Sequence, residues 1–76
     1  MKNTLLNEVR ILIRQGEETN LIKAQQLLMN YLKNHVKATD IWLLLIRIEW
    51  NTPLEDPERI VEYVNNIFLI HMLYFF

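Results

Sequence analysis

The chain has 76 residues, of which 51% are hydrophobic and 22% are charged, and its eight Lys and Arg residues nearly balance nine Asp and Glu residues. This length and composition exclude a disordered tail and a multidomain enzyme. The net charge of −1 provides no basic footprint for nucleic acid or anionic lipid, and the absence of Cys excludes disulfides and thiolate metal sites. We therefore expect one small domain, residues 1–76, whose core supplies only modest stability.

No membrane-directed segment is predicted. Near the N-terminus, Glu8, Arg10 and Arg14 interrupt the apolar residues before the core of a signal peptide could form. No window reaches the roughly 18 uncharged apolar residues that a transmembrane helix requires. The sequence therefore favours a cytoplasmic protein that does not enter a membrane.

The first two expected helices have clear amphipathic patterns. Over residues 3–15, Leu5, Val9 and Leu12 form one stripe, and Gly16 follows at a position that suits a left-handed helix cap. Over residues 20–33, apolar side chains recur at steps of three and four: Ala24, Leu27, Leu28, Tyr31 and Leu32.

The next two expected helices are more apolar. In residues 39–51, eight of the ten positions from 41 to 50 are apolar, so this helix is buried on several sides or leaves one side for a partner. Thr39 or Asp40 is expected to cap its first turn. The last helix begins at Pro57 behind Asp56 as N-cap, and its apolar face contains Ile60, Val61, Tyr63, Val64, Ile67 and Phe68.

Apolar positions repeat between the second and the fourth expected helix. A shift of 36 residues places Ala24, Leu27, Leu28, Tyr31 and Leu32 over Ile60, Tyr63, Val64, Ile67 and Phe68, and all ten residues are apolar. This period lies in the range of helical repeat arrays.

With these features the chain resembles a tetratricopeptide repeat protein. Ala24 and Leu28 match the small and the large residue of that motif's second helix. Trp42 and Leu45 match the large residue and the Leu in the first helix of the next repeat. The Leu position of the first repeat falls on Ile11, and the chain departs from the motif at Tyr31, Val36, Ile46 and Glu49. The resemblance implies an all-α fold of two antiparallel helix hairpins, residues 3–34 and 39–72, in a right-handed array. A small antiparallel helical bundle is the alternative.

Neither catalysis nor metal binding is predicted. His35 and His71 have no second ligand at a helical spacing of three or four residues, and the chain's single Gly, Gly16, excludes a Gly-rich phosphate loop. Arg10 and Arg14 lie one helical turn apart, which fits a solvated helix face better than an RNA site in a chain of balanced charge. We expect no enzyme activity, no cofactor and no metal.

The excess of apolar residues instead indicates protein binding. If the first and third helices line an inner surface, as the resemblance implies, their register exposes eight residues: Leu6, Val9, Ile13, Asp40, Leu43, Arg47, Trp50 and Asn51. Trp and Arg are enriched in binding hot spots. The sequence therefore predicts an interaction module that holds an apolar peptide or helix of another protein. In one alternative the chain is a dedicated inhibitor, immunity protein or secretion chaperone, and in another Leu43 and Trp50 fill the chain's own core.

The C-terminal segment also carries apolar side chains that we expect to be buried against other residues. Nine of the ten residues from 67 to 76 are apolar, and none is charged if His71 is neutral. Such a segment can fold back over the other helices, pack against a second copy or a partner, or be covered by further chain. A self-associating helical bundle is therefore a further functional alternative.

Overall fold

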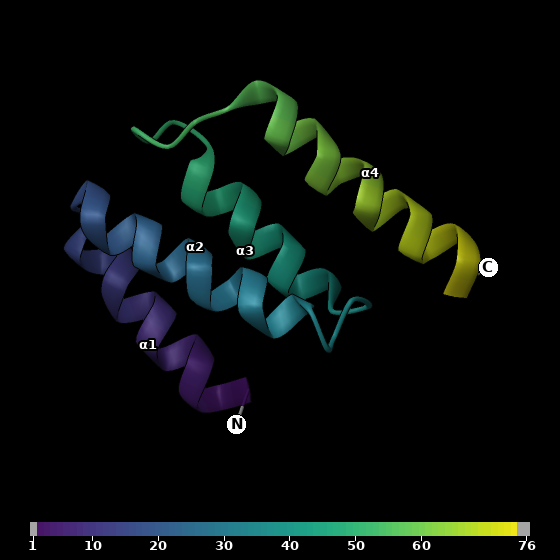
Figure 1. Ribbon diagram of the computed structural model, residues 1–76, viewed down its shortest axis with the longest axis horizontal. Coiled ribbons are helices and arrows are strands. Elements are labelled where there is room, and N and C mark those ends of the chain that lie inside the picture. Colours follow the sequence, from purple (N-terminus) through teal and green to yellow (C-terminus); the bar gives the residue numbers. More distant parts are fainter. Residues whose placement is uncertain (1, 75–76) are drawn as a thin grey trace.

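The computed structural model describes residues 2–74, which form four α-helices and no strand (Figure 1). They are α1 (Lys2–Gln15), α2 (Glu18–Leu32), α3 (Thr39–Glu49) and α4 (Pro57–Tyr74). The predicted all-α fold class is confirmed, and the ends of the first three expected helices lie within two residues of the observed ends. The last two residues of the apolar 67–76 segment lie outside the described residues.

Local chemistry explains the end of α1 and the start of α4. Gly16 adopts a φ of +75°, which ends α1 in a conformation that other residues rarely adopt. Asp56 Oδ1 accepts hydrogen bonds from the backbone N–H groups of Glu58 at 3.1 Å and Arg59 at 3.4 Å, which confirms Asp56 as the N-cap of α4. The N-cap position of α3 is Ala38, because Thr39 already belongs to the helix. Within the first turn, however, Asp40 Oδ1 accepts a hydrogen bond from the backbone N–H of Ile41 at 3.0 Å, as one of the two predicted alternatives requires.

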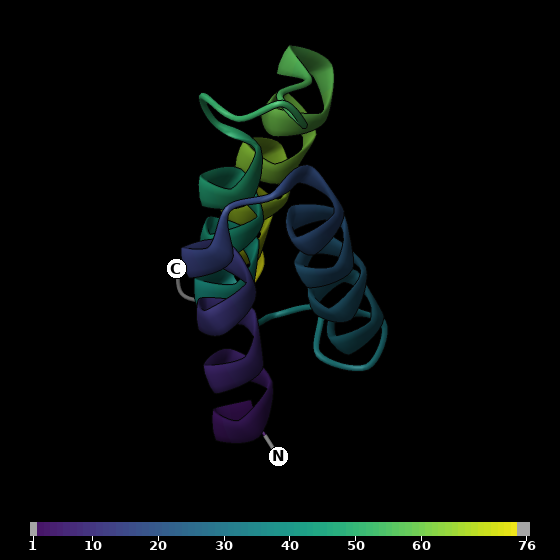
Figure 2. The same cartoon turned by 90° about the vertical axis from the view of Figure 1, so that its left-hand side faces the viewer.

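The helices form two antiparallel hairpins that lie side by side. α2 packs against both α1 and α3, and α4 packs against α3. As a result, α1 and α4 lie at opposite ends of a flat molecule of 38 × 30 × 16 Å (Figure 1). Figure 2 shows α1 and α3 on one side of the molecule and α2 on the other. The central helices α2 and α3 therefore each pack extensively against two others, whereas α1 packs mainly on α2 and α4 mainly on α3.

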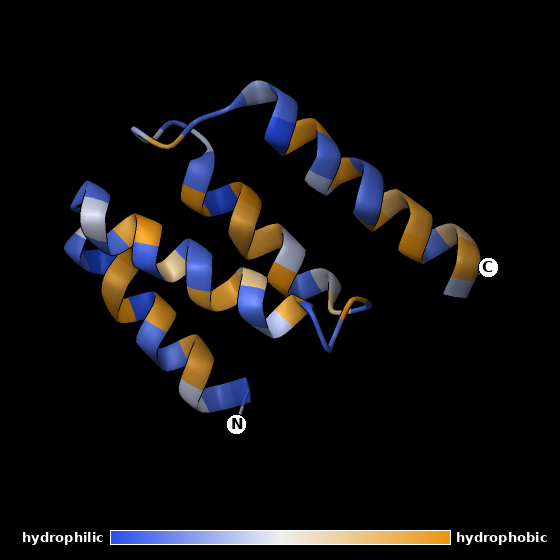
Figure 3. Cartoon of the chain, viewed as in Figure 1, coloured by the Kyte–Doolittle hydropathy of each residue, from blue (hydrophilic) through white to orange (hydrophobic). Residues whose placement is uncertain are grey.

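Residues from all four helices build one core that joins the hairpins. Its buried members are Val9, Leu12, Leu21, Ala24, Leu28, Leu32, Ile41, Leu45, Ile48 and Tyr63. In Figure 3, apolar segments recur along α4 beyond its hydrophilic first turn, although α3 is the helix on which α4 mainly packs. The outer side of α4 therefore carries apolar residues that the core does not use.

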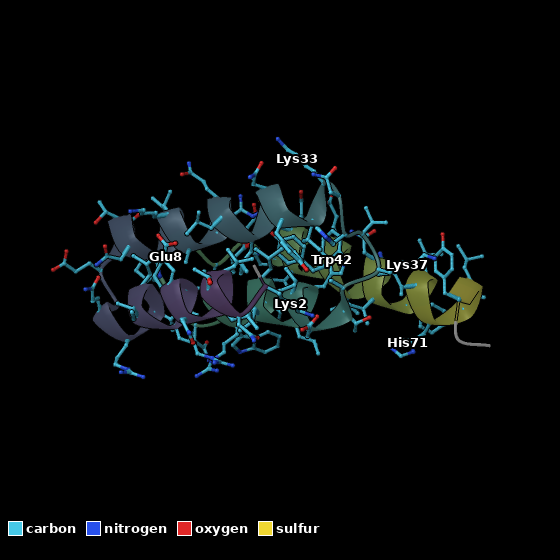
Figure 4. All side chains as sticks on the ribbon, turned by 90° about the horizontal axis from the view of Figure 1, so that it is seen from below. Lys2, Glu8, Lys33, Lys37, Trp42 and His71 are labelled. Carbon is cyan, nitrogen blue, oxygen red and sulfur yellow. The ribbon has the colours of Figure 1, made fainter. Side chains whose placement is uncertain are left out.

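Aromatic contacts hold α4 against the rest of the molecule. The ring centroids of Trp42 and Tyr63 lie 5.9 Å apart, and Trp42 Nε1 donates a hydrogen bond to the carbonyl of Val36 at 3.0 Å. Near the C-terminal end of α4, Lys37 Nζ lies 3.9 Å from the centroid of the Tyr74 ring (Figure 4). These contacts fix one side of α4 and leave its opposite side free.

Candidate protein-binding surface

An ion pair joins the beginnings of α1 and α3. Lys2 Nζ lies 2.8 Å from Asp40 Oδ2, and Figure 4 shows Lys2 where α1 begins. The hydrogen bond that Lys2 donates to Asp40 is the main reason that the pKa of Lys2 is raised above its ordinary value. Asp40, one of the eight residues predicted to bind a partner, is thus exposed but already engaged within the chain.

Farther along the two helices, α1 and α3 line an open hollow with a basic rim. Its floor consists of the half-buried side chains of Ile13 and Leu44, and its rim consists of the exposed residues Arg10, Arg14 and Arg47. None of these three Arg side chains has an ion-pair partner within residues 2–74. We call these five residues the arginine hollow. Three positive charges around an apolar floor attract an anionic group that is carried on an apolar segment.

Three of the eight predicted residues are less accessible than expected. Val9 is fully buried, so the prediction that it lines the surface is wrong: it lies on the same stripe of α1 as Leu5 and Leu12 and belongs to the core. Leu6 and Ile13 are half-buried against that core, and Ile13 remains accessible from the arginine hollow. Sequence reasoning had also missed Leu44 as part of this surface.

Trp50 is exposed, but it does not adjoin the arginine hollow. Its side chain is 58% exposed and lines a separate hollow at the end of α3, together with Pro57, Ile60 and Val61 of α4. Leu43 is also more than half exposed, so the alternative that Trp50 and Leu43 fill the core is wrong. The structure therefore divides the predicted groove into two separate surfaces.

The last of the eight residues, Asn51, has a local structural role. Its φ of +59° lies in the left-handed region, where Asn is among the few side chains found regularly. Its backbone N–H donates a hydrogen bond to Glu55 Oε1 at 2.9 Å. Asn51 therefore shapes the connection between α3 and α4, in addition to being exposed.

The outer side of α4 forms an apolar strip. Val61, Val64, Phe68 and Met72 recur at steps of three and four residues and are each at least half exposed. We call these four residues the α4 strip. Residues 67–74 continue α4 as a helix and bury Ile70. The described part of this segment therefore does not turn back over the other helices, which was one of the three alternatives, although Tyr74 does contact Lys37 of the α2–α3 connection. The strip remains without cover from residues 2–74.

A buried polar network connects α2, α3 and α4, and sequence reasoning had missed it. Glu49 is fully buried, and its two carboxylate oxygens accept hydrogen bonds from Arg59 Nε at 2.8 Å and from Gln25 Nε2 at 3.0 Å. The hydrogen bond to Glu49 raises the pKa of Arg59 above its ordinary value. Because both oxygens are satisfied by side chains of the fold, the network positions three helices and offers no free acid or base.

The buried phenol of Tyr63 leads us to expect a fold that is less stable at alkaline pH. Burial, and next the neighbouring Glu49 carboxylate, raise the pKa of the Tyr63 phenol far above its usual value of 10.0. The folded chain therefore keeps Tyr63 protonated where the unfolded chain ionises it. We expect the free energy of unfolding to fall by about 1.4 kcal/mol per pH unit above pH ~10 on account of this group.

Urea unfolding of the wild type and of Tyr63→Phe, at several values from neutral pH to pH ~11, measures this effect. Near neutral pH we expect Tyr63→Phe to be at least as stable as the wild type, because the substitution removes a buried hydroxyl that has no hydrogen-bond partner within residues 2–74. The variant is expected to lose less stability than the wild type as the pH rises. Identical losses in both proteins would show that Tyr63 is not responsible.

Within the described part of the chain, no group of three His, Cys, Asp or Glu residues could hold a metal ion. In the same residues, no helix combines the length and the apolar content of a membrane span. Comparisons with protein-family models, with curated proteins and with solved structures found no match to this chain.

Proposed function

We propose that this chain is a non-catalytic protein-interaction module, and that its α1/α3 surface binds an acidic segment of another protein. The arginine hollow carries this proposal. Arg10 and Arg14 of α1 and Arg47 of α3 line one hollow, and none has an ion-pair partner among residues 2–74. Guanidinium groups form two parallel hydrogen bonds with carboxylates, which makes the side chains of Asp and Glu suitable ligands.

Apolar side chains next to the hollow define the rest of the partner. Ile11 and Leu43 are more than half exposed on α1 and α3, and each lies three or four residues from an Arg of the hollow. Such positions are neighbours on a helix surface. The matching partner segment carries Asp or Glu about one helical turn from Leu, Ile or Phe. The resemblance to tetratricopeptide repeats favours the same surface, since the first helices of those repeats line the binding side.

The proposed module works in the cytoplasm, a compartment that the lack of Cys favours. One form of this function is the masking of a single cognate protein by a dedicated inhibitor, immunity protein or secretion chaperone. That form requires tight one-to-one binding, whereas a general scaffold binds several related peptides weakly.

A display library of random helical peptides, selected on the immobilised protein, tests the proposal without knowledge of the natural partner. We expect the wild type to enrich peptides with Asp or Glu one turn from a large apolar residue. Arg47→Glu is expected to weaken binding of the enriched peptides at least about tenfold, because it replaces attraction by repulsion. Binding of the wild type should also weaken with rising salt.

Lys23→Glu is the matched control, since Lys23 is exposed on α2 and does not line the arginine hollow. It introduces the same change of charge and should leave peptide binding close to that of the wild type. Enrichment of the same peptides by the wild type and by Arg47→Glu would contradict the proposal, as would a failure to enrich acidic peptides at all.

A further inference from the structure

The two hairpins repeat each other in burial as well as in sequence pattern. Two pairs of equivalent residues agree in the exposed fraction of their side chains. Val9 and Leu45 are both fully buried, Ala24 is fully buried, and its equivalent Ile60 is 8% exposed. Each pair is 36 residues apart. Where two equivalent side chains differ in exposure, we therefore infer that the more exposed one lacks a neighbour.

At the α4 end the missing neighbour lies on the outer side. Leu28 and Leu32 of α2 are 0% and 5% exposed, whereas the equivalent Val64 and Phe68 of α4 are 50% and 64% exposed. Leu28 and Leu32 lie on the same side of α2 as Gln25, whose side chain donates a hydrogen bond to α3. The second hairpin therefore covers this side of α2, but nothing in residues 2–74 covers the same side of α4.

At the α1 end the missing neighbour lies on the opposite face. Ile41 and Tyr63 of the second hairpin are 0% and 2% exposed and belong to the core that joins the hairpins. Their equivalents Leu5 and Leu27 are only half-buried and line an open groove between α1 and α2. We call this the front groove. It also contains Thr4, Glu8, Asn30 and Tyr31.

The contact between the two hairpins thus joins two surfaces, one on α2 and one on the second hairpin. An equivalent of each surface occurs elsewhere in the chain without a partner: the α4 strip is the equivalent of the first, and the front groove is the equivalent of the second. We infer that copies of this chain associate head to tail, with the α4 strip of one copy in the front groove of the next. The internal contact identifies the occupant of the front groove. Within one chain, the second hairpin packs on α2 through the positions that are equivalent to those of the front groove. Because α4 is the equivalent of α2, the front groove of the next copy is expected to pack on α4 in the same way. Repetition of one such contact produces a ring or a filament.

A paired change in chemistry supports this occupant. In the internal contact, Gln25 of α2 meets Glu49 of α3, and both are polar. At the free ends their equivalents are Val61 on the α4 strip and Ile13 on α1, and both are apolar. In the same register, head-to-tail packing brings Val61 of one copy to Ile13 of the following copy, which lies outside the front groove at the α1 side of the arginine hollow. A polar residue at only one of these positions would leave a buried group without a partner.

Two variants test this inference, one that disrupts the α4 strip and one that disrupts the front groove. Phe68→Glu places a charge on the α4 strip, and Leu5→Arg places one in the front groove. We expect light scattering after size exclusion to give the single-chain mass of 9.2 kDa for each variant alone. An equimolar mixture is expected to form a complex of twice that mass, because each variant retains the face that the other lacks.

Control variants separate association from folding and from the proposed function. Glu8→Arg changes an exposed residue of the front groove, so it should behave like Leu5→Arg even if the latter folds poorly. Leu43→Glu changes an exposed residue outside both faces and should associate like the wild type. Phe68→Glu should still select acidic peptides, so failure of either proposal leaves the other standing.

Two outcomes would overturn the inference. In the first, the wild type remains a single chain at millimolar concentration. In the second, Phe68→Glu is monomeric but both front-groove variants associate like the wild type, and mixing yields no complex of defined size. The second outcome would mean that two α4 strips pack on each other symmetrically.

Discussion

Replacement of Arg59 by Met is expected to lower the free energy of unfolding by about 3 kcal/mol, because it leaves a buried carboxylate without its charged partner. Glu49 is fully buried, so its carboxylate cannot regain water when the guanidinium is removed. The hydrogen bond from Gln25 remains but carries no charge. We expect the lower end of the usual range for broken buried pairs, since the Arg59 side chain is itself 39% exposed.

The loss should be repaired in part by a second change. Glu49→Gln in the Arg59→Met background removes the stranded charge, and the amide can still hydrogen-bond with Gln25. We expect circular dichroism and urea unfolding to show a folded double variant that is more stable than Arg59→Met alone. The wild type, both single variants and the double variant form one thermodynamic cycle. Equal stability of Arg59→Met and the wild type would show that the network contributes nothing to folding.

Leu28→Ala is expected to cost about 2–5 kcal/mol, whereas Val64→Ala at the equivalent position should change the stability of the single chain by less than about 0.5 kcal/mol. Leu28 is fully buried between neighbouring helices, and its truncation leaves a cavity. Val64 is half exposed on the α4 strip, so truncation removes few contacts within the chain.

Urea unfolding of both variants in dilute solution, where association is weakest, measures this difference. The free energy of unfolding of Val64→Ala should approach that of the wild type under these conditions. Similar losses for the two variants would mean that the outer side of α4 is covered by its own chain. That result would also remove the basis for a second copy at the strip.

Much of the fold could be predicted because it depends on local signals. Apolar residues spaced three and four positions apart predicted the helices, and Asp56 followed by Pro57 predicted the start of α4. Gly16 likewise marked the end of α1. Each of these signals acts within one or two helical turns, so the sequence pattern contains the relevant physics.

The candidate site was harder to predict because it depends on which helices meet. Arg10 and Arg14 resemble an ordinary solvated face until α3 brings Arg47 to the same hollow. Trp50 shares a periodic face with Leu43, but α3 ends at Glu49 and Trp50 turns toward α4. No periodic pattern marks contacts of this kind between distant segments.

The buried network shows the same limit at a single residue. Glu49 occupies a position next to Ile48 and four residues after Leu45, both of which are core residues, so the helical register did indicate burial. The register could not indicate the partners, because Gln25 and Arg59 come from two other helices. A charged residue in a core stripe is therefore a signal to search for distant polar partners.

Sedimentation equilibrium of the wild-type chain tests most directly whether these helices expose more apolar surface than one copy can bury. From micromolar to millimolar concentration, we expect the weight-average mass to rise steadily above the single-chain value of 9.2 kDa. A mass that stays at this value over the whole range would contradict the account.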